Sequence, residues 1–159
     1  MALSAVLERR YHPTDDCIMS KKSPKIAALI AHRLGGPWPA QYAAYFDCFN
    51  DGLYYEAHDV LEELWLAGGR AAPNYSFHKG LIQLAGAFVH LQKERLRPSV
   101  ALFNLAEANL LLYPTVHDGC GVGDLLAVIR DWRGEIVNRE FTVNPLRQRP
   151  PPRLAGVES

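Results

Sequence analysis

The chain contains little cysteine and no closely spaced cysteine pair. Its three cysteines, Cys17, Cys48 and Cys120, are odd in number and far apart, and no CxxC motif occurs. This pattern argues against a disulfide framework and against a structural zinc site built on cysteines. It is typical of a reducing compartment, so we expect a cytoplasmic protein.

Long apolar runs and an excess of charge of one sign are also missing. The longest strongly apolar stretch, 84–91, contains His90 and is too short to span a bilayer. The first ten residues lack a long apolar segment after a basic start, so we expect no signal peptide. Lysine plus arginine number 17, as do aspartate plus glutamate, so no net charge favours a polyanion. We therefore expect neither a membrane nor a nucleic acid as a partner.

Strand-like alternation of polar and apolar residues is absent, whereas helical periodicity recurs along the chain. Four aromatic residues, for example, fall at i, i+3, i+4 and i+7 and form one apolar stripe: Tyr42, Tyr45, Phe46 and Phe49. Similar patterns predict helices over 25–34, from Pro39 to a cap at Gly52, and over 54–67, 74–94 and 98–113. Helical spacing then continues through Leu125, Ile129, Trp132 and Ile136. We predict an all-α fold, a compact bundle of about five helices preceded by a short N-terminal helix.

The composition divides the chain into three parts. The 159 residues suffice for one domain with a buried core. Residues 1–23 have mixed character and are predicted to be an N-terminal extension, and 24–141 are predicted to form the single helical domain. Residues 142–159 carry four of the prolines and are predicted to be an extended tail.

The helix predicted over 54–67 carries the most informative polar residues. At about 100° per residue, His58 and Glu62 lie roughly 40° apart, and Trp65 lies about 20° to the other side of His58. They fall at the margin of an apolar arc, where the core meets the rim and a cleft would be lined. The opposite face is expected to be solvated and carries three acidic residues, Glu56, Asp59 and Glu63.

The helix predicted over 74–94 supplies a possible counterpart. It is apolar in most directions, but one narrow stripe holds polar and small residues: Lys79, Gln83, Gly86, Ala87, His90 and Glu94. Burying a polar group without a hydrogen bond lowers stability, so we expect the polar residues of this stripe to have hydrogen-bonding partners or a ligand. A short connection favours antiparallel packing of the helices over 54–67 and 74–94. In that arrangement His58 and Glu62 would face Gln83 and His90.

Two motifs in these helices carry a family resemblance. The first extends over 49–58 and continues through Leu61, Glu62 and Trp65, and the second is KGLIQLA over 79–85, followed by His90. Together they resemble an uncharacterised bacterial and archaeal family, domain of unknown function three hundred and nine, over about 42–113. The resemblance implies a compact bundle of about five helices and no established activity. The family pattern H-E-x-x-E-x-x-W has Asp59 in place of its usual second residue, glutamate.

These residues support three interpretations of one candidate site. In the first, His58, Glu62 and His90 bind a divalent transition metal, because imidazole and carboxylate suit such ions. In the second, His58, Glu62, Gln83 and His90 line a metal-free pocket for a small ligand, with Trp65 as its wall. In the third, His58 and Glu62 only hydrogen-bond to each other and to Gln83 or the backbone, and so fix the helix register. No motif assigns a reaction or a substrate.

A protein–protein interaction module is the alternative from a different functional class. The segment 49–57 resembles the elbow of a tetratricopeptide-type helical hairpin, and the two helices over 77–94 and 98–113 would form a second hairpin. No clear second copy occurs at the expected period of about 34 residues. Self-association through a tyrosine-rich helical surface is a further expectation. An interaction module should expose an apolar groove, whereas a site should bring His58, Glu62 and His90 together.

Overall fold

The computed structural model describes residues 23–158 and confirms the predicted all-α bundle. Nearly all of the predicted N-terminal extension lies outside the described residues. The helices are α1 (Ser23–Ile30), α2 (Ala40–Asn50), α3 (Tyr54–Gly68), α4 (Tyr75–Gln92), α5 (Leu96–Leu110) and α6 (Val122–Asn138). Two short 3₁₀ turns, η2 (Ala31–Arg33) and η3 (Pro145–Arg147), complete the helical segments of the described chain. None of the described helices is both long enough and apolar enough to cross a membrane.

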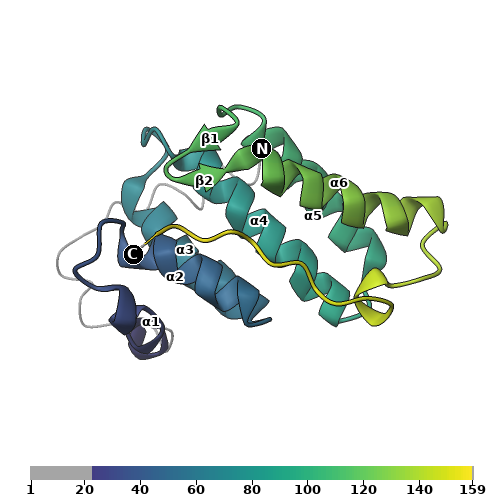
Figure 1. Cartoon of the computed structure of the whole chain (residues 1–159), viewed down its shortest axis with the longest axis horizontal. Helices are drawn as coiled ribbons and strands as arrows, with labels where there is room; N and C mark the ends of the chain where they lie inside the picture. Colours follow the sequence, from purple (N-terminus) through teal and green to yellow (C-terminus); the bar gives the residue numbers. More distant parts are fainter. Residues whose placement is uncertain (1–22, 159) are drawn as a thin grey trace, which may run out of the picture.

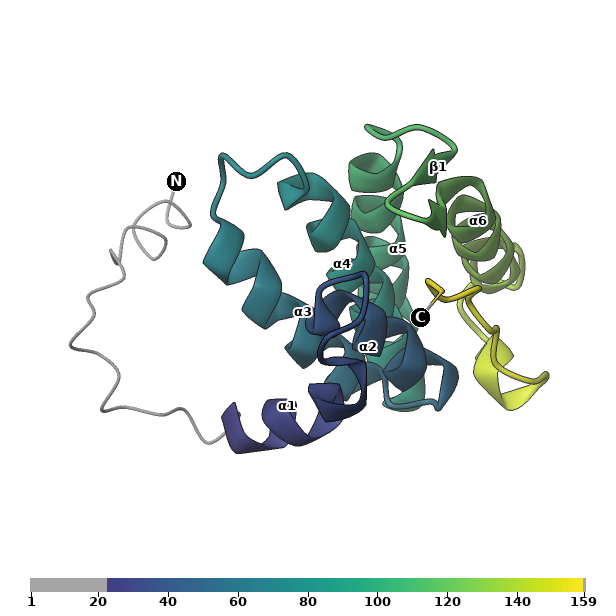
Figure 2. The same cartoon turned by 60° about the vertical axis from the view of Figure 1, so that its left-hand side comes forward.

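α4 lies at the centre of the bundle, with α3 on one side and α5 on the other (Figure 2). α2 packs against α3, and α6 packs against α5. Figure 1 shows the C-terminal segment running across the front of the bundle toward α2. This order places the polar faces of α3 and α4 beside each other, as their sequences predicted.

A tight turn at Gly52 reverses the chain between α2 and α3. Gly52 has φ of 76°, which a residue without Cβ adopts at little cost. The N–H groups of Gly52 and Leu53 donate to the carbonyls of Phe49 and Cys48 at 3.0 and 2.9 Å. The predicted glycine cap is therefore confirmed, and the turn sets the register in which α3 returns along α2.

Aromatic side chains from several helices meet in the core. The ring of Phe88 on α4 lies 5.2 Å from Phe49 of α2, 5.6 Å from Phe103 of α5 and 5.1 Å from Trp132 of α6. Edge-to-face contacts of this kind stabilise a core beyond the area that they bury. The Tyr45 hydroxyl also donates to the Leu81 carbonyl at 2.6 Å. These contacts fix α4 against its neighbours.

The loop between α5 and α6 contains a small antiparallel hairpin that the sequence analysis did not predict. Its strands, β1 (Val116–His117) and β2 (Cys120–Gly121), have two residues each, which is too short for an alternating pattern. The turn residues Asp118 and Gly119 both have positive φ, at 46° and 69°. An Asp-Gly pair in this conformation is a typical two-residue hairpin turn.

The proline-rich C-terminal segment packs along the bundle. Leu154 and Val157 are buried in the core. The side-chain amide of Asn50 donates to the Leu154 carbonyl at 2.8 Å and accepts from the Leu154 N–H at 2.7 Å. The guanidinium of Arg149 lies 4.1 Å from the centre of the Trp132 ring. These contacts hold the segment although its backbone is extended.

Candidate functional site

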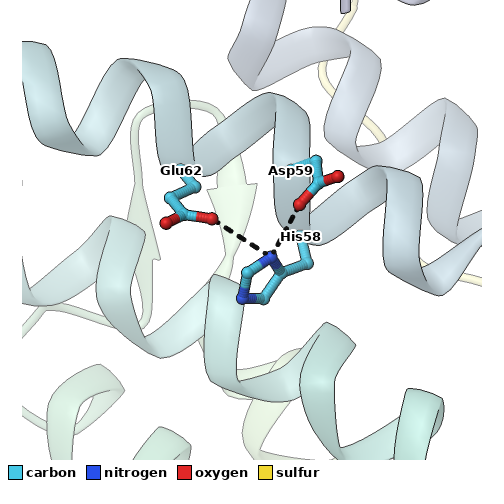
Figure 3. Close-up of side chains that lie close together, drawn as sticks. All are labelled: His58, Asp59 and Glu62. Carbon is cyan, nitrogen blue, oxygen red and sulfur yellow. Dashed lines mark hydrogen bonds and ion pairs between the residues drawn. The ribbon is translucent and has the colours of Figure 1, made fainter. Parts of the chain in front are cut away.

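His58, Asp59 and Glu62 converge on α3 (Figure 3). The Nδ1 atom of His58 lies 3.3 Å from Asp59 Oδ1 and 3.4 Å from Glu62 Oε2. Residues four apart share one face of a helix, so the contact between His58 and Glu62 follows from their spacing. The Tyr55 ring lies nearly parallel to the imidazole, with 6.3 Å between the ring centroids. The Nε2 atom is on the ring edge that faces away from both carboxylates (Figure 3).

The predicted solvated position of Asp59 is wrong. Its side chain is only 7% exposed, compared with 34% for His58 and 32% for Glu62. α1 contributes to this burial, because it packs against α3 and its Lys25 lies close enough to Asp59 to interact with its charge. The Lys25 ammonium of α1 lies 2.9 Å from the Glu56 carboxylate, so α1 covers part of the acidic face. A helical projection treats each helix as isolated and does not include such a neighbour.

A pocket of about 210 Å³ lies between α3 and α4 and contains most of the predicted polar residues. His58 and Tyr55 line it from α3, and Gln83 and His90 line it from α4. The remaining walls are Ile82, Gly86, Val89 and Leu102. The antiparallel arrangement therefore brings His58, Gln83 and His90 to one place. Glu62 and Trp65 are not among the residues that line this pocket.

Gln83 and His90 differ in their hydrogen bonds: Gln83 has a partner on α5, whereas the Nδ1 atom of His90 has none within the described residues. The Gln83 Oε1 atom accepts a hydrogen bond from Asn109 Nδ2 of α5 at 2.7 Å, so its amide N–H groups are what Gln83 can offer to a ligand. The buried Nδ1 atom of His90 has no hydrogen-bond partner within the described residues. Burial lowers the pKa of His90, and the nearby charges of Arg95 and Lys93 lower it further. The His90 imidazole is therefore neutral at neutral pH.

Trp65 lies one helical turn beyond Glu62 and packs on α4 away from the pocket. Its ring lies 5.2 Å from the ring of Tyr75, at the start of α4. Its buried Nε1 atom has no hydrogen-bond partner within residues 23–158. Trp65 thus contributes apolar contact between α3 and α4, and Glu62 acts on the pocket only through His58.

The metal-ligating group in the structure differs from the predicted set. His58, Asp59 and Glu62 offer three ligand atoms that all lie within 4.8 Å of one another. In the described part of the chain this group includes Asp59 and does not include His90. His90 shares the pocket with His58 but belongs to the opposite helix. One histidine and two carboxylates from a single helix thus form the group that could hold an ion.

Tyr55, Asp59 and Leu102 are among the residues of this region that the sequence analysis did not select. Tyr55 lies three residues before His58, and the helical spacing that identified Glu62 also predicts its position. Asp59 required knowledge of the packing of α1. Leu102 comes from α5 and reaches the pocket only through tertiary packing, so no local sequence signal identifies it.

The described cysteines do not supply a nucleophile. Cys48 and Cys120 are both buried. Burial raises the pKa of Cys48 to about 11 and that of Cys120 to about 12, with nearby carboxylates contributing to both shifts. A thiol with such a pKa is protonated at neutral pH and unreactive.

Comparisons with known proteins identify a family and no individual relative. No curated protein and no solved structure matches the chain. A family model does match, over residues 42–102, and its description is "Domain of unknown function (DUF309)". The matched segment contains α3, α4 and most of α2, and therefore His58, Asp59, Glu62, Gln83 and His90. The family that the two motifs resemble is thus the family whose model matches residues 42–102 of this helical protein.

Proposed function

We propose that the protein binds a small organic ligand in the pocket between α3 and α4, with His58 as the hydrogen-bonding anchor. One observation supports this most strongly: His58 from α3 and Gln83 and His90 from α4 line a single pocket whose other walls are mainly apolar. A few polar groups on apolar walls are the usual form of a small-molecule site. The volume of about 210 Å³ suits a ligand of roughly seven to ten non-hydrogen atoms.

The carboxylates beside His58 determine what its imidazole offers. A neutral imidazole carries one N–H group, and two carboxylate oxygens lie within 3.4 Å of Nδ1. The proton therefore belongs on Nδ1, and Nε2 carries a lone pair. A carboxylate orients and polarises the histidine of hydrolytic triads in the same way. In the neutral imidazole this arrangement leaves Nε2 as an acceptor for a hydrogen bond from the ligand.

The pocket walls indicate the chemical class of the ligand. His58 Nε2 accepts a hydrogen bond, the Gln83 amide donates one, and a hydroxyl group can satisfy both at once. Ile82, Val89 and Leu102 provide contact for an apolar body. We therefore propose a small, largely apolar molecule that carries a hydroxyl group.

Two small probes of equal size test this proposal. Phenol and toluene each have an apolar ring, and only phenol carries a hydroxyl. Titration of the ¹⁵N-labelled protein should shift the backbone amide signals of Gly86 and Val89 at lower concentrations of phenol than of toluene. His58→Ala should remove the preference for phenol, whereas His32→Ala should not. His32 is the matched control because it also contacts a carboxylate, with Nε2 2.8 Å from Asp47 Oδ2, but far from α4 in sequence and outside the pocket.

A second variant separates pocket filling from loss of the anchor. Gly86→Leu places a side chain into the pocket and should abolish the shifts from both probes. If neither probe affects the pocket amides of the folded wild-type protein, or if His58→Ala leaves the preference intact, the proposed function is wrong.

A protein–protein interaction surface is a second candidate function, and exposed apolar residues near the end of α5 favour it. Leu105, Leu111, Leu112 and Val116 are each more than half exposed, and two helical hairpins, α2–α3 and α4–α5, are present as that alternative expects. Self-association through this surface should appear as a concentration-dependent sedimentation coefficient that Leu112→Glu lowers. A monomer at all concentrations would remove self-association from consideration.

A further inference from the structure

We propose that His58, Asp59 and Glu62 form a binding site for a divalent transition-metal ion, and that the ion changes the hydrogen-bonding role of His58 in the pocket. The first half of this proposal concerns the three side chains alone. The second half rests on the proposed ligand-binding function. The metal site itself is therefore testable without any pocket ligand.

Two of the three distances in the trio match the spacing between ligands of one ion. Imidazole nitrogen and carboxylate oxygen bind Zn²⁺ at about 2.0–2.2 Å, so two ligands of a tetrahedral ion lie about 3.4 Å apart. His58 Nδ1 lies 3.3 Å from Asp59 Oδ1 and 3.4 Å from Glu62 Oε2. All three ligand atoms lie within 4.8 Å of one another.

Burial and charge also suit a bound ion. Asp59 is more than nine-tenths buried and so has a fixed position, whereas His58 and Glu62 are about a third exposed and leave an access route from solvent. Two carboxylates balance the charge of a divalent cation. One nitrogen and two oxygen ligands suit zinc, manganese, iron, cobalt or nickel, and leave coordination positions for water.

Metal binding at Nδ1 moves the imidazole proton. Without an ion, the Nδ1–H group faces the carboxylates and Nε2 accepts a hydrogen bond in the pocket. An ion can bind Nδ1 only when that atom carries no proton. The single proton of the neutral imidazole then resides on Nε2, so no net proton is released, and Nε2 becomes a donor. The ion thereby changes the preferred ligand group from a donor, such as a hydroxyl, to an acceptor, such as a carbonyl.

The first experiment measures ion binding alone. Protein treated with chelator and then freed of it is titrated with Zn²⁺ by calorimetry and with Co²⁺ by visible absorption. We expect one equivalent per chain, and a loss of affinity of at least about tenfold in each of His58→Ala, Asp59→Asn and Glu62→Gln. Glu62 is partly exposed, so Glu62→Gln retains the fold and keeps the test valid if Asp59→Asn does not fold.

The contact between His32 and Asp47 provides the matched control for ion binding. It is also a histidine–carboxylate contact, at 2.8 Å, but Arg33 donates to both oxygens of Asp47 at 2.7 Å each and occupies them. His32→Ala should therefore leave the titration unchanged. No binding to the wild-type protein, or an equal loss in His32→Ala and His58→Ala, would overturn the metal site.

The second experiment follows the proton. Long-range ¹H–¹⁵N spectra of His58 distinguish the Nδ1–H form from the Nε2–H form, and Zn²⁺ should convert the first into the second. In the pocket, Zn²⁺ should raise the affinity for cyclohexanone relative to phenol by at least about threefold, because cyclohexanone only accepts hydrogen bonds. An unchanged tautomer in the ion-bound protein would overturn the second half.

The outcomes separate this inference from the function on which it partly rests. If Zn²⁺ binds through the three residues and no probe enters the pocket, the metal site is retained and the proposed ligand-binding function fails. If phenol binds as expected and no ion titrates, the metal site fails and the ligand-binding function is retained.

Discussion

The two faces of α4 contrast in how they meet their neighbours. Toward α5 the contact is close: the Ser99 hydroxyl donates to the Ala87 carbonyl at 2.9 Å in the buried interface. A Cβ atom added to Gly80 would lie 2.9 Å from Leu110 Cγ. Toward α3, the same helix borders a pocket of about 210 Å³ and carries a buried His90 nitrogen without a partner in the described structure.

The side of α4 that faces α5 thus contributes mainly to stability, whereas the side that borders the pocket presents polar groups that a ligand can contact. Close packing with satisfied hydrogen bonds fixes the position of α4. The pocket and the unpaired polar atom on the other face do not contribute packing of this kind, and the proposed ligand site accounts for their occurrence together. The α4–α5 contact therefore acts as the support that holds Gln83 and His90 in place opposite His58.

The largest expected effect comes from truncating an aromatic side chain in the α4–α5 contact. Phe103 of α5 is fully buried, with its ring 5.6 Å from that of Phe88. Phe103→Ala should lower the free energy of unfolding by about 3–5 kcal/mol. The adjacent Leu102 lines the pocket and is partly exposed, so Leu102→Ala should cost less than about 2 kcal/mol. Urea unfolding followed by circular dichroism measures the stability of both variants. Equal losses in Phe103→Ala and Leu102→Ala would mean that the pocket side of α4 is packed as closely as its contact with Phe103.

Two glycines on α4 allow the same substitution at the close contact with α5 and at the pocket. In Gly80→Ala the new Cβ would lie 2.9 Å from Leu110 Cγ and 3.3 Å from the Ala106 backbone oxygen, so the helices must separate. Crowding of this kind costs about 1–3 kcal/mol and exceeds the gain in helix propensity of up to about 1 kcal/mol. In Gly86→Ala the Cβ would meet only Leu102 Cδ1, at 3.0 Å, and this side-chain end can move.

We therefore expect Gly80→Ala to lower the urea midpoint of unfolding and Gly86→Ala to leave it unchanged or raise it. A Gly86→Ala variant that is as destabilised as Gly80→Ala would mean that α4 is packed as closely at the pocket as it is at Gly80.

The fold was more predictable than the site because helices follow from local spacing. The observed α3, Tyr54–Gly68, and α4, Tyr75–Gln92, lie within a few residues of the predicted ranges. Spacing along each helix, together with antiparallel packing, placed His58, Gln83 and His90 in one pocket. The burial of Asp59 depends on α1, and Leu102 comes from α5, so both depend on contacts that a single helix does not encode.

Acidification provides a third test, because burial lowers the pKa values of two α4 histidines, His78 and His90. An unfolded histidine has a pKa of about 6.5. As the pH falls through this value, the unfolded chain binds protons before the folded protein does, so the free energy of unfolding decreases. The stability from this source is complete above the unfolded pKa and is lost as the pH falls toward the folded values.

Urea unfolding between about pH 7.5 and pH 5.5 should show this decrease, and most carboxylates titrate below that range. His90→Gln should reduce the decrease in the free energy of unfolding on acidification. His78→Gln should remove much of the decrease that is left. A stability that stays constant or rises on acidification would show that neither imidazole is held neutral. A profile that only His78→Gln flattens would mean that the pocket exposes His90 to solvent as freely as the unfolded chain does.

The smallest expected effect concerns the pair of His58 and Glu62, and it decides between a site and a purely structural network. Each side chain is about a third exposed, and ion pairs with such exposure contribute about 0.2–1 kcal/mol. A double-mutant cycle of His58→Ala and Glu62→Ala should therefore give a coupling energy in this range, and added salt should reduce it. A coupling energy above about 2 kcal/mol would instead favour the interpretation that these groups exist to fix helix register. A weak coupling means that the contact between His58 and Glu62 is not retained for stability, which is the condition that a binding role for His58 requires.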